Sequence, residues 1–422
     1  MLVRISGKTI EGSVEAPPSK SFTHRALICA SLAEGNSKIV NPSPCDDSFA
    51  TIKALTGLGI EASLMDKYLM ISGGNLKPKM GLINCEESGT TLRLIVGVTS
   101  LINQRIIVTG DKSLLRRPIG ELVRTLNNLG AKITCNGDYP PVISYGGFTG
   151  GITTVRGDIS SQFISSLLLV SPLGNKETTI HAHRIESKPY IFMTLKTQEA
   201  FGIRVKLYEE DDSIIFQIPT TRYKSTDFFI EGDWSSANYF LAAAAISGHV
   251  KVNNVRLDSL QADKEIVKVL KEAGASVRSG NDFVEVIGGY LESFEYDVSN
   301  TPDLLPTLAV LATVAKGRSL IKGIGRCRLK ESDRVESVIN NLKALGVDTR
   351  VSNNELTISG VGRVKSGTIN SYGDHRIAMA FSILSLVSEG SIVIEDPLCV
   401  SKSFPNFWDN LSALGMKVEV VI

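Results

Sequence analysis

Residues 266–279, IVKVLKEAGASVRS, contain the pattern that decides the fold. Apolar side chains recur at helical spacing as far as Leu270, Gly274 follows, and an alternating segment begins directly after the glycine. Glycine at the end of a helix is typical of a left-handed residue, because it has no Cβ to clash there. The stretch therefore predicts a helix, a glycine cap and a β-strand.

The same pattern occurs six times along the chain. The six segments are LTGLGIEA, LNNLGAKI, QEAFGIRV, LKEAGASV, LKALGVDT and LSALGMKV. Successive glycines are 71, 72, 72, 72 and 69 residues apart, and they are Gly59, Gly130, Gly202, Gly274, Gly346 and Gly415. A nearly constant period of this length indicates a repeated structural unit.

Each repeat also contains a second, more apolar helix, followed by a turn of small residues and a β-branched strand. These segments are HRALICASLAEGNSKIV, TTLRLIVGVTSLINQRIIV, QFISSLLLVSPLGNKETTI, ANYFLAAAAISGHVKV, LPTLAVLATVAKGRSLI and RIAMAFSILSLVSEGSIVI. A helix that is apolar on every side is a buried helix. The unit is therefore βαβαββ, and six units predict an α/β protein of two similar domains with three repeats each.

The starts of the buried helices are rich in residues that cap helices. They read PPSKSFTHR, ESGTTLR, RGDISSQ, EGDWSSAN, NTPDLLP and YGDHR. Capping alone explains any one of them, because Ser, Thr and Asp accept hydrogen bonds from the first N–H groups. If three buried helices run parallel in each domain, however, their N-termini converge on one face, where free N–H groups and helix dipoles favour anions.

Basic residues lie near these starts, at Lys20, Arg25, Arg93, Arg117, Lys330, Arg334, Arg376 and Lys402. Residues 330–334, KESDR, combine two of these cations with carboxylates. One interpretation is a solvated helix face with paired charges four residues apart. The other is an anion clamp with a proton-transferring acid beside it. The residues alone leave both interpretations open.

Composition excludes several classes of protein. The 422 residues include 45 Lys and Arg against 44 Asp and Glu, so no overall basic field favours a nucleic acid or an anionic membrane. No apolar run approaches the ~20 residues of a membrane helix, and no secretory signal precedes the first strand. The six cysteines lie far apart, as expected for free thiols in a reducing compartment. We therefore expect a cytoplasmic protein.

Ten stretches resemble the 5-enolpyruvylshikimate-3-phosphate synthase family over nearly the whole chain and in the family's order. They are PPSKSFTHRAL, ESGTTLRL, RRPIGEL, DISSQFISSLLL, ESKPYI, GDWSSANYFLAAAAI, PDLLPTLAVLA, LKESDR, GDHRIAMAFSI and SKSFPNFW. The resemblance implies the enolpyruvyl transferase fold, an inside-out α/β barrel in each of two domains around buried parallel helices. It places one domain at residues 13–230 and the other at 1–12 plus 231–422, with a hinge near 11–15 and 229–233.

The resemblance also implies a reaction. The family transfers the enolpyruvyl group of phosphoenolpyruvate to the 5-hydroxyl of shikimate 3-phosphate in the shikimate pathway and releases phosphate. No redox change is involved and cations can stabilise the charge, so we expect no cofactor and no catalytic metal. We expect these two small molecules as the partners, with no nucleic acid and no membrane, and a monomer. The family also implies inhibition by glyphosate.

Carried over by matching positions, the residues for shikimate 3-phosphate, the acceptor, are Lys20, Ser21, Arg25, Ser160, Ser161, Gln162, Ser187, Tyr190, Asp303 and Lys330. Those for phosphoenolpyruvate are Lys20, Gly89, Arg117, Gln162, Arg334, Arg376 and Lys402. The resemblance gives Asp303, assisted by Lys20, the role of accepting the hydroxyl proton. It makes Glu331 the acid and base at the methylene carbon.

Two positions depart from the family's pattern. Glu87 stands where many members have Asn, and its charge should repel phosphoenolpyruvate unless it faces away or pairs with Arg93. Arg326 stands where relatives carry Asn or His, and it either adds to the clamp or faces solvent. The contacts of both side chains are thus open questions for the structure.

Three alternatives to this reaction are weighed against the residues. The sister transferase that uses UDP-N-acetylglucosamine would carry a Lys-Asn pair where this chain has Lys20-Ser21, and a reactive loop Cys that Cys85 and Cys135 do not match. An RNA-end cyclase would need nucleotide-binding features that the sequence lacks. A non-catalytic anion-binding protein would not need Asp303, Lys330 and Glu331 together.

Overall fold

The computed structural model describes residues 1–111 and 113–421, which form two compact units. Unit 1 consists of residues 1–17 and 232–422, and unit 2 of residues 18–231. The predicted hinge at 229–233 contains the second boundary. The first boundary lies between residues 17 and 18, after the predicted hinge at 11–15, because residues 11–15 belong to strand β2 (Ile10–Glu15), which pairs in parallel with β15 (Gly248–Asn253) of unit 1.

Unit 2 contains three repeats. The first comprises α1 (Lys20–Leu32), β3 (Gly35–Val40), α2 (Asp46–Gly57), β4 (Glu61–Leu64) and β5 (Tyr68–Gly73), completed by β14 (Asp227–Phe229). The second comprises β6 (Leu82–Asn84), α3 (Gly89–Thr99), β7 (Ile106–Thr109), η1 (Leu114–Arg116), α4 (Gly120–Asn128), β8 (Ile133–Asn136) and β9 (Tyr139–Ser144). The third comprises β10 (Gly151–Arg156), α5 (Ser161–Val170), η2 (Ser171–Leu173), β11 (Thr178–His183), α6 (Lys188–Ala200), β12 (Lys206–Glu210) and β13 (Ser213–Ile218).

Unit 1 is built in the same way. Its first repeat comprises β2, α7 (Trp234–Ser247), β15, η3 (Ala262–Glu265), α8 (Ile266–Glu272), β16 (Ser276–Ser279) and β17 (Phe283–Ile287). The next comprises β18 (Glu295–Asp297), α9 (Leu305–Val314), β19 (Arg318–Lys322), η4 (Gly325–Leu329), α10 (Arg334–Ala344), β20 (Thr349–Ser352) and β21 (Glu355–Ser359). The last comprises β22 (Gly367–Ile369), α11 (His375–Ser382), η5 (Ile383–Leu386), β23 (Ile392–Glu395), η6 (Pro397–Lys402), α12 (Phe407–Ala413) and β24 (Lys417–Val421), completed by β1 (Leu2–Ser6).

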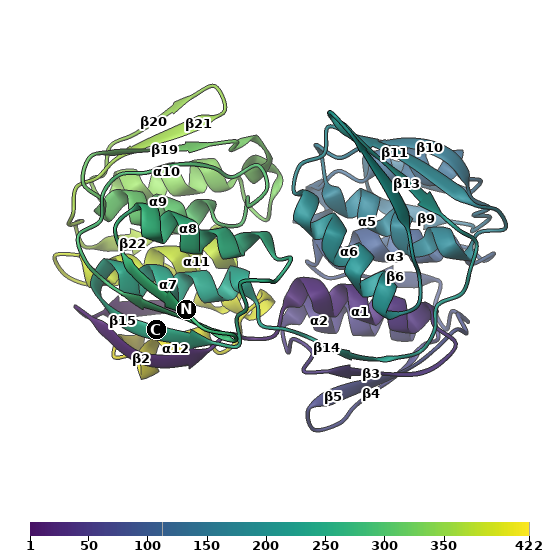
Figure 1. Ribbon diagram of the computed structural model, residues 1–422, viewed down its shortest axis with the longest axis horizontal. Helices are drawn as coiled ribbons and strands as arrows, with labels where there is room; N and C mark the ends of the chain where they lie inside the picture. The colour runs from purple at the N-terminus through teal and green to yellow at the C-terminus, as the bar shows by residue number, and fades with distance from the viewer. Residues whose placement is uncertain (112, 422) are drawn as a thin grey trace. The chain divides into compact units, whose positions relative to one another are not determined.

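Each repeat forms a four-stranded sheet with one parallel pair and two antiparallel pairs, as in β6-β7-β9-β8, where β6 and β7 are parallel. Strands from distant parts of the chain complete one sheet in unit 2 and two sheets in unit 1, where β2 pairs with β15. In unit 2, β14 pairs with β3, and in unit 1, β1 lies between β23 and β24. The sheets surround helices that lie inside each unit (Figure 1).

The six repeat glycines confirm the predicted helix caps. All have a left-handed backbone, with φ from 82° at Gly346 to 103° at Gly415. After each one, the next residue donates its N–H to a carbonyl five residues back, as Ile60 does to Leu55 and Val347 to Leu342. This is the Schellman pattern, which satisfies carbonyls at the helix end. At Gly59 a Cβ would also lie 2.2 Å from the carbonyl oxygen of Lys77, so a side chain is excluded sterically.

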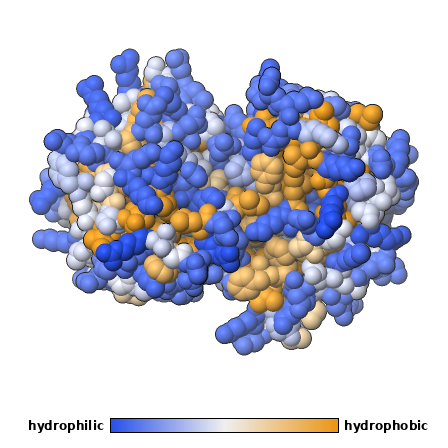
Figure 2. Space-filling view, viewed as in Figure 1, coloured by the Kyte–Doolittle hydropathy of each residue, from blue (hydrophilic) through white to orange (hydrophobic). Residues whose placement is uncertain are grey.

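Each unit has its own apolar core. The helices α1, α3 and α5 of unit 2, and α7, α9 and α11 of unit 1, are buried on nearly every side, as predicted. Hydrophilic residues cover most of the visible surface (Figure 2). In the described part of the chain, no helix combines the length and hydrophobicity that crossing a membrane requires.

Candidate active site

In unit 2, the first turns of α1, α3 and α5 lie close together. Ser19, Ser88 and Ser160 cap these helices by accepting hydrogen bonds from Phe22, Thr91 and Gln162, respectively. A chain of hydrogen bonds connects α1, α2 and α3. His24 Nδ1 of α1 lies 2.7 Å from Thr51 Oγ1 of α2, and Thr51 Oγ1 lies 2.6 Å from Thr91 Oγ1 of α3. The helix N-termini therefore converge, as the sequence predicted.

Lys20 stands at the first position of α1 and is held by a carboxylate. Its Nζ lies 2.8 Å from Asp47 Oδ2, and both side chains are largely buried, 12% and 8% exposed. Burial, opposed by the charge of Asp47 and assisted by those of Lys20 and Arg25, lowers the pKa of the neighbouring His24 to about 3. His24 is therefore neutral beside the two cations. Nothing in the sequence pattern had identified Asp47.

Arg25 joins two of the other predicted acceptor residues. Its side chain is buried, and it donates from Nε to Thr194 Oγ1 at 2.8 Å, and from its terminal nitrogens to the carbonyls of Ser21 at 2.8 Å and Tyr190 at 2.9 Å. Burial lowers its pKa to about 10, which leaves the guanidinium charged at neutral pH. These contacts fix the plane of the guanidinium, and its remaining N–H groups can pair with an anionic ligand.

Hydroxyl groups supply the rest of the predicted phosphate site. Ser160 and Ser161 are buried at the start of α5, and Ser187 is buried immediately before α6. Ser187 has φ of 55°, a left-handed conformation that is strained for a residue with a side chain. Such strain is typical of functional sites, and it was not predictable from the sequence because it depends on the tertiary structure.

Gln162 connects α5 to α3. Its Oε1 accepts a hydrogen bond from Arg93 at 2.8 Å, and its Nε2 donates to Thr90 Oγ1 at 2.8 Å. Gly89, at the start of α3, lies beside two guanidinium groups, because a Cβ there would be 2.6 Å from Arg117 and 2.8 Å from Arg93. The absence of a side chain at Gly89 thus keeps a small space open beside two cations.

Glu87 is exposed, and its Oε1 accepts a hydrogen bond from Ser113 Oγ at 3.2 Å. Arg93 uses one terminal nitrogen to donate to Gln162 and to the carbonyl of Gly89. Ser113 lies directly before η1, so one oxygen of Glu87 is engaged by that segment.

In unit 1, the side chain of Arg334 is the centre of an ion network. It is 1% exposed and contacts three carboxylates: Asp374 Oδ2 at 2.8 Å, Asp303 Oδ1 at 2.5 Å and Glu331 Oε2 at 2.6 Å. Burial alone would lower the pKa of Arg334, but the three carboxylates raise it. Arg334 is therefore a permanent cation that brings the two predicted proton-transfer residues, Asp303 and Glu331, to one point.

Asp303 is surrounded by cations. Besides Arg334, its oxygens lie 3.2 Å from Lys330 Nζ and 3.1 Å from Arg376. Burial would raise the pKa of this carboxyl, but Arg376, Lys330 and Arg334 together hold it well below its ordinary value. Asp303 is therefore ionised when no substrate is bound.

Residues 330–334 do not form a solvated helix face, and the anion clamp stays a prediction. Arg334 is almost fully buried, and the Lys330 side chain is only 18% exposed. Burial lowers the pKa of Lys330, with Asp303 opposing that shift and the charges of Arg334 and Arg326 adding to it. Arg326 itself is 9% exposed, so it does not face solvent but adds positive charge beside Lys330.

The starts of the three buried helices of unit 1 also meet. From α11, Arg376 reaches Asp303 before α9, and it donates to the carbonyl of Ser235 in α7 at 3.4 Å. Asp374 caps α11 by accepting from the N–H of Arg376. The prediction of side-chain caps fails for α7 and α9, which begin without one. At α7, the N–H of Trp234 donates to Gln261 instead.

Asp263 is a buried carboxyl that sequence reasoning missed. It lies in η3, is 1% exposed and accepts a short hydrogen bond from Ser235 Oγ. Burial, together with the negative charge of Asp303 and against the effects of Arg376 and Ser235, raises its pKa to about 7. Lys402, another predicted site residue, is buried at the end of η6, 7% exposed.

The predicted site residues thus fall into two groups. The unit 2 cluster consists of Lys20, Ser21, Arg25, Gly89, Arg117, Ser160, Ser161, Gln162, Ser187 and Tyr190. The unit 1 cluster consists of Asp303, Lys330, Glu331, Arg334, Arg376 and Lys402. Among residues 1–111 and 113–421, no group of His, Cys, Asp and Glu has a metal-binding arrangement. The arrangement can bind several phosphate or carboxylate groups and move a proton.

Comparisons with known proteins agree on one family. The profile of EPSP synthase (3-phosphoshikimate 1-carboxyvinyltransferase) matches residues 5–411. The 3-phosphoshikimate 1-carboxyvinyltransferase of Methanothermobacter thermautotrophicus is 39% identical over 416 residues, 97% of each chain. That of Methanococcus maripaludis (strain C5) is 36% identical over 431 residues, all of each chain.

Solved structures have the same fold. The EPSP synthase of Acinetobacter baumannii superimposes with a TM-score of 0.82 at 27% identity, over 99% of this chain and 100% of that one. The enolpyruvyl transferase NikO of Streptomyces tendae superimposes with a TM-score of 0.81 at 15% identity, over 99% and 98% of the two chains. At that identity, NikO supports the fold alone.

Proposed function

The chain belongs to the EPSP synthase family, and from that premise we propose how its two clusters divide the family's reaction. The enzyme transfers the enolpyruvyl group of phosphoenolpyruvate to shikimate 3-phosphate in the shikimate pathway. The acceptor carries a phosphate and a carboxylate, and so does the donor. Four anionic groups require many cations, and that requirement accounts for the basic residues in both clusters.

The unit 2 cluster binds shikimate 3-phosphate. Ser160, Ser161 and Ser187 donate hydrogen bonds to its phosphate, which also gains from the positive end of α5. Arg25 pairs with its carboxylate through the N–H groups that Thr194, Ser21 and Tyr190 leave available. The binding groups are mostly buried and held by the protein itself, so the site is organised before the ligand arrives.

Phosphoenolpyruvate uses cations from both clusters. In unit 2, phosphoenolpyruvate contacts Arg117, Lys20 and Gln162 and occupies the open space at Gly89. Arg334, Arg376 and Lys402 serve it in unit 1. A phosphate and a carboxylate on a three-carbon molecule need donors that are close together and directional, which guanidinium groups provide.

The chemistry is an addition followed by an elimination. The hydroxyl oxygen of the acceptor bonds to C2 of phosphoenolpyruvate while C3 takes a proton, which gives a tetrahedral intermediate. Loss of phosphate and of a proton from C3 then restores the double bond. Glu331 gives the proton to C3 and takes one back, and Asp303, assisted by Lys20, accepts the hydroxyl proton.

The single observation that carries this proposal is that Arg334 forms ion pairs with both Asp303 and Glu331. With no substrate bound, the cations make Asp303 a weak base, because they stabilise its ionised form. An anionic donor that binds Arg334 and Arg376 neutralises two of these charges, so the proton affinity of Asp303 increases. Glu331 is displaced from Arg334 by the same event and becomes able to carry a proton. Substrate binding thereby prepares both residues.

Phosphate release from phosphoenolpyruvate tests the function. With shikimate 3-phosphate as the acceptor, the purified protein should release phosphate stoichiometrically with the enolpyruvyl product. UDP-N-acetylglucosamine should support no release, because Ser21 stands where the sister transferase would have Asn. If phosphate is released with UDP-N-acetylglucosamine but not with shikimate 3-phosphate, the chain has the activity of the sister transferase. If shikimate 3-phosphate binds but neither acceptor supports phosphate release, the non-catalytic alternative is favoured.

We further propose that the enzyme is a cytoplasmic monomer that binds neither nucleic acid nor membranes. Its balanced charge, 45 basic against 44 acidic residues, supports this, because neither polyanion would be attracted over long range. Light scattering at micromolar concentration would give the mass of one chain. A stable dimer in that measurement would contradict the proposal.

A further inference from the structure

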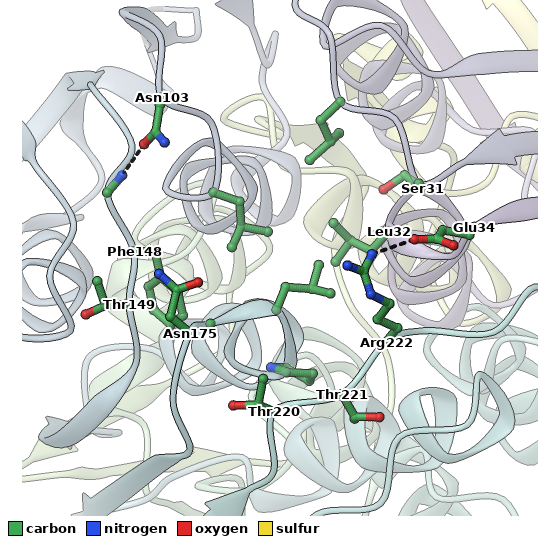
Figure 3. A pocket seen from close by; sticks show the side chains of 17 residues that line it. Ser31, Leu32, Glu34, Asn103, Phe148, Thr149, Asn175, Thr220, Thr221 and Arg222 are labelled. Atoms are coloured by element: carbon green, nitrogen blue, oxygen red, sulfur yellow. Dashed lines mark hydrogen bonds and ion pairs between the residues drawn. The ribbon is translucent and has the colours of Figure 1, made fainter.

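Unit 2 contains a cavity of about 890 Å³ far from the unit 2 cluster (Figure 3). It is lined by residues at the C-terminal ends of the buried helices, among them Leu32 of α1, Leu101 after α3 and Pro172 after α5. The predicted acceptor residues stand at the opposite ends of these helices. Since α1 has 13 residues, the cavity is separated from Lys20 by the length of that helix, roughly 20 Å.

The floor of the cavity is apolar. Leu32, Phe148 and Pro172 are buried there, and Leu101 and Leu173 are half-buried against the open space. Polar side chains stand around this floor, including Asn103, Asn175, Thr220 and Thr221, as Figure 3 shows. A cavity of this size that combines apolar side chains with polar groups has room for a small organic molecule.

Both signs of charge are present on one side of the cavity. Glu34 Oε1 lies 2.5 Å from an Arg222 nitrogen, and the two side chains are 65% and 79% exposed. A simple anion would be attracted to Arg222 but repelled by Glu34. A simple cation would be attracted to Glu34 but repelled by Arg222. An ion pair this exposed contributes little to stability, so a ligand that carries both charges can replace it.

We propose that this cavity binds a free α-amino acid with a large apolar side chain. The carboxylate of the ligand pairs with the Arg222 guanidinium, and its ammonium group pairs with the Glu34 carboxylate. The negative ends of the α1 and α3 dipoles also favour the ammonium group. The apolar side chain lies on Leu32, Phe148 and Leu173 and displaces water from them.

Calorimetric titration of the full chain tests the proposal, with L-phenylalanine as the probe. We expect a dissociation constant of about 1 mM or lower. Two analogues lack one charged group each: 3-phenylpropionate lacks the ammonium group and 2-phenylethylamine lacks the carboxylate. Each should bind roughly tenfold more weakly, the scale of a lost charge-assisted hydrogen bond. L-Alanine lacks the large apolar side chain and should also bind roughly tenfold more weakly or worse, because it leaves the apolar floor in contact with water.

Variants locate the binding. Glu34→Gln and Arg222→Gln should each weaken L-phenylalanine binding roughly tenfold, and Thr220→Trp should abolish it by filling the cavity. Arg204→Gln is the matched control, because Arg204 is an equally exposed partner of a glutamate in unit 2 that does not line the cavity. Absence of binding at about 10 mM, equal binding of 2-phenylethylamine, or binding unchanged in Glu34→Gln and Arg222→Gln would each overturn the proposal.

Discussion

The two clusters of predicted site residues are built from different groups. In the unit 2 cluster, hydroxyls, helix N-termini and cations predominate, and protein contacts hold Arg25 and Gln162 in place. In the unit 2 cluster a cation also contacts a carboxylate, Lys20 with Asp47, whereas in the unit 1 cluster Arg334 alone contacts three carboxylates. Hydroxyls and helix ends bind an anion without changing protonation, whereas paired carboxylates can exchange protons. The difference fits the proposal that unit 2 mainly binds the acceptor and that unit 1 carries the proton transfer.

The largest expected effect is on turnover, in unit 1. Asp303→Asn and Glu331→Gln should each lower kcat by roughly 100-fold or more, because each removes a positioned acid or base. Their dissociation constants for shikimate 3-phosphate should remain within a few-fold of the parent. Glu336→Gln is the control, since Glu336 lies on the same helix as Arg334 but is exposed and pairs with Arg328. Turnover near the parental value in both site variants would show that neither carboxylate has the assigned role.

In unit 2, the expected effect is on the affinity for shikimate 3-phosphate. Arg25→Ala should raise the dissociation constant for shikimate 3-phosphate roughly 10- to 100-fold, the loss expected for a paired charge. The rate of the bound complex should change less. Because Arg25 is buried, the variant must first be shown to unfold cooperatively near the parental temperature. If affinity for the acceptor is unchanged in the folded variant, Arg25 does not hold its carboxylate.

A smaller effect is expected at Gly89. An added Cβ would meet Arg117 at 2.6 Å and Arg93 at 2.8 Å, so both guanidinium groups must move. Gly89→Ala should therefore raise the inhibition constant of glyphosate roughly tenfold or more, and the KM for phosphoenolpyruvate by less. Gly81→Ala is the control, because a Cβ there meets only a carbonyl oxygen at 3.9 Å. Inhibition that does not compete with phosphoenolpyruvate would contradict this assignment of the loop.

The smallest effect concerns stability and pH. The pKa of Asp263 is about 7 in the folded protein against its ordinary value of 3.8. The folded state therefore keeps a proton that the unfolded chain loses, and the contribution of this carboxyl to the free energy of unfolding falls as pH rises from about 4 to 7.

Asp263→Asn resembles the protonated form and should escape that loss. Thermal unfolding should show the variant gaining a few degrees on the parent at pH 8 and little at pH 5. Asp297→Asn, at an exposed carboxyl of unit 1, should show no such difference. An equal shift of Asp263→Asn at both pH values would mean that the carboxyl is not protonated in the fold.

The sequence predicted the repeats well because their signals are local. A glycine cap and a serine N-cap are each decided by a few neighbouring residues, so Gly59 and Ser88 could be identified directly. The contacts of Lys20 with Asp47, and of Arg334 with Asp374, join residues 27 and 40 positions apart. No pattern of spacing reports such pairs, and for the same reason the buried Asp263 and the charge of Arg326 beside Lys330 emerged only in the structure.

A single pair of variants tests most directly whether binding and reaction are divided between the units. The affinity for shikimate 3-phosphate is measured by calorimetry and the rate of enolpyruvyl transfer by single turnover, in Arg25→Ala and in Glu331→Gln. We predict a crossed result: Arg25→Ala loses affinity and keeps most of its rate at saturation, and Glu331→Gln keeps affinity and loses roughly 100-fold or more in rate. If both variants lose the same quantity, affinity or rate, the division between the two units is contradicted.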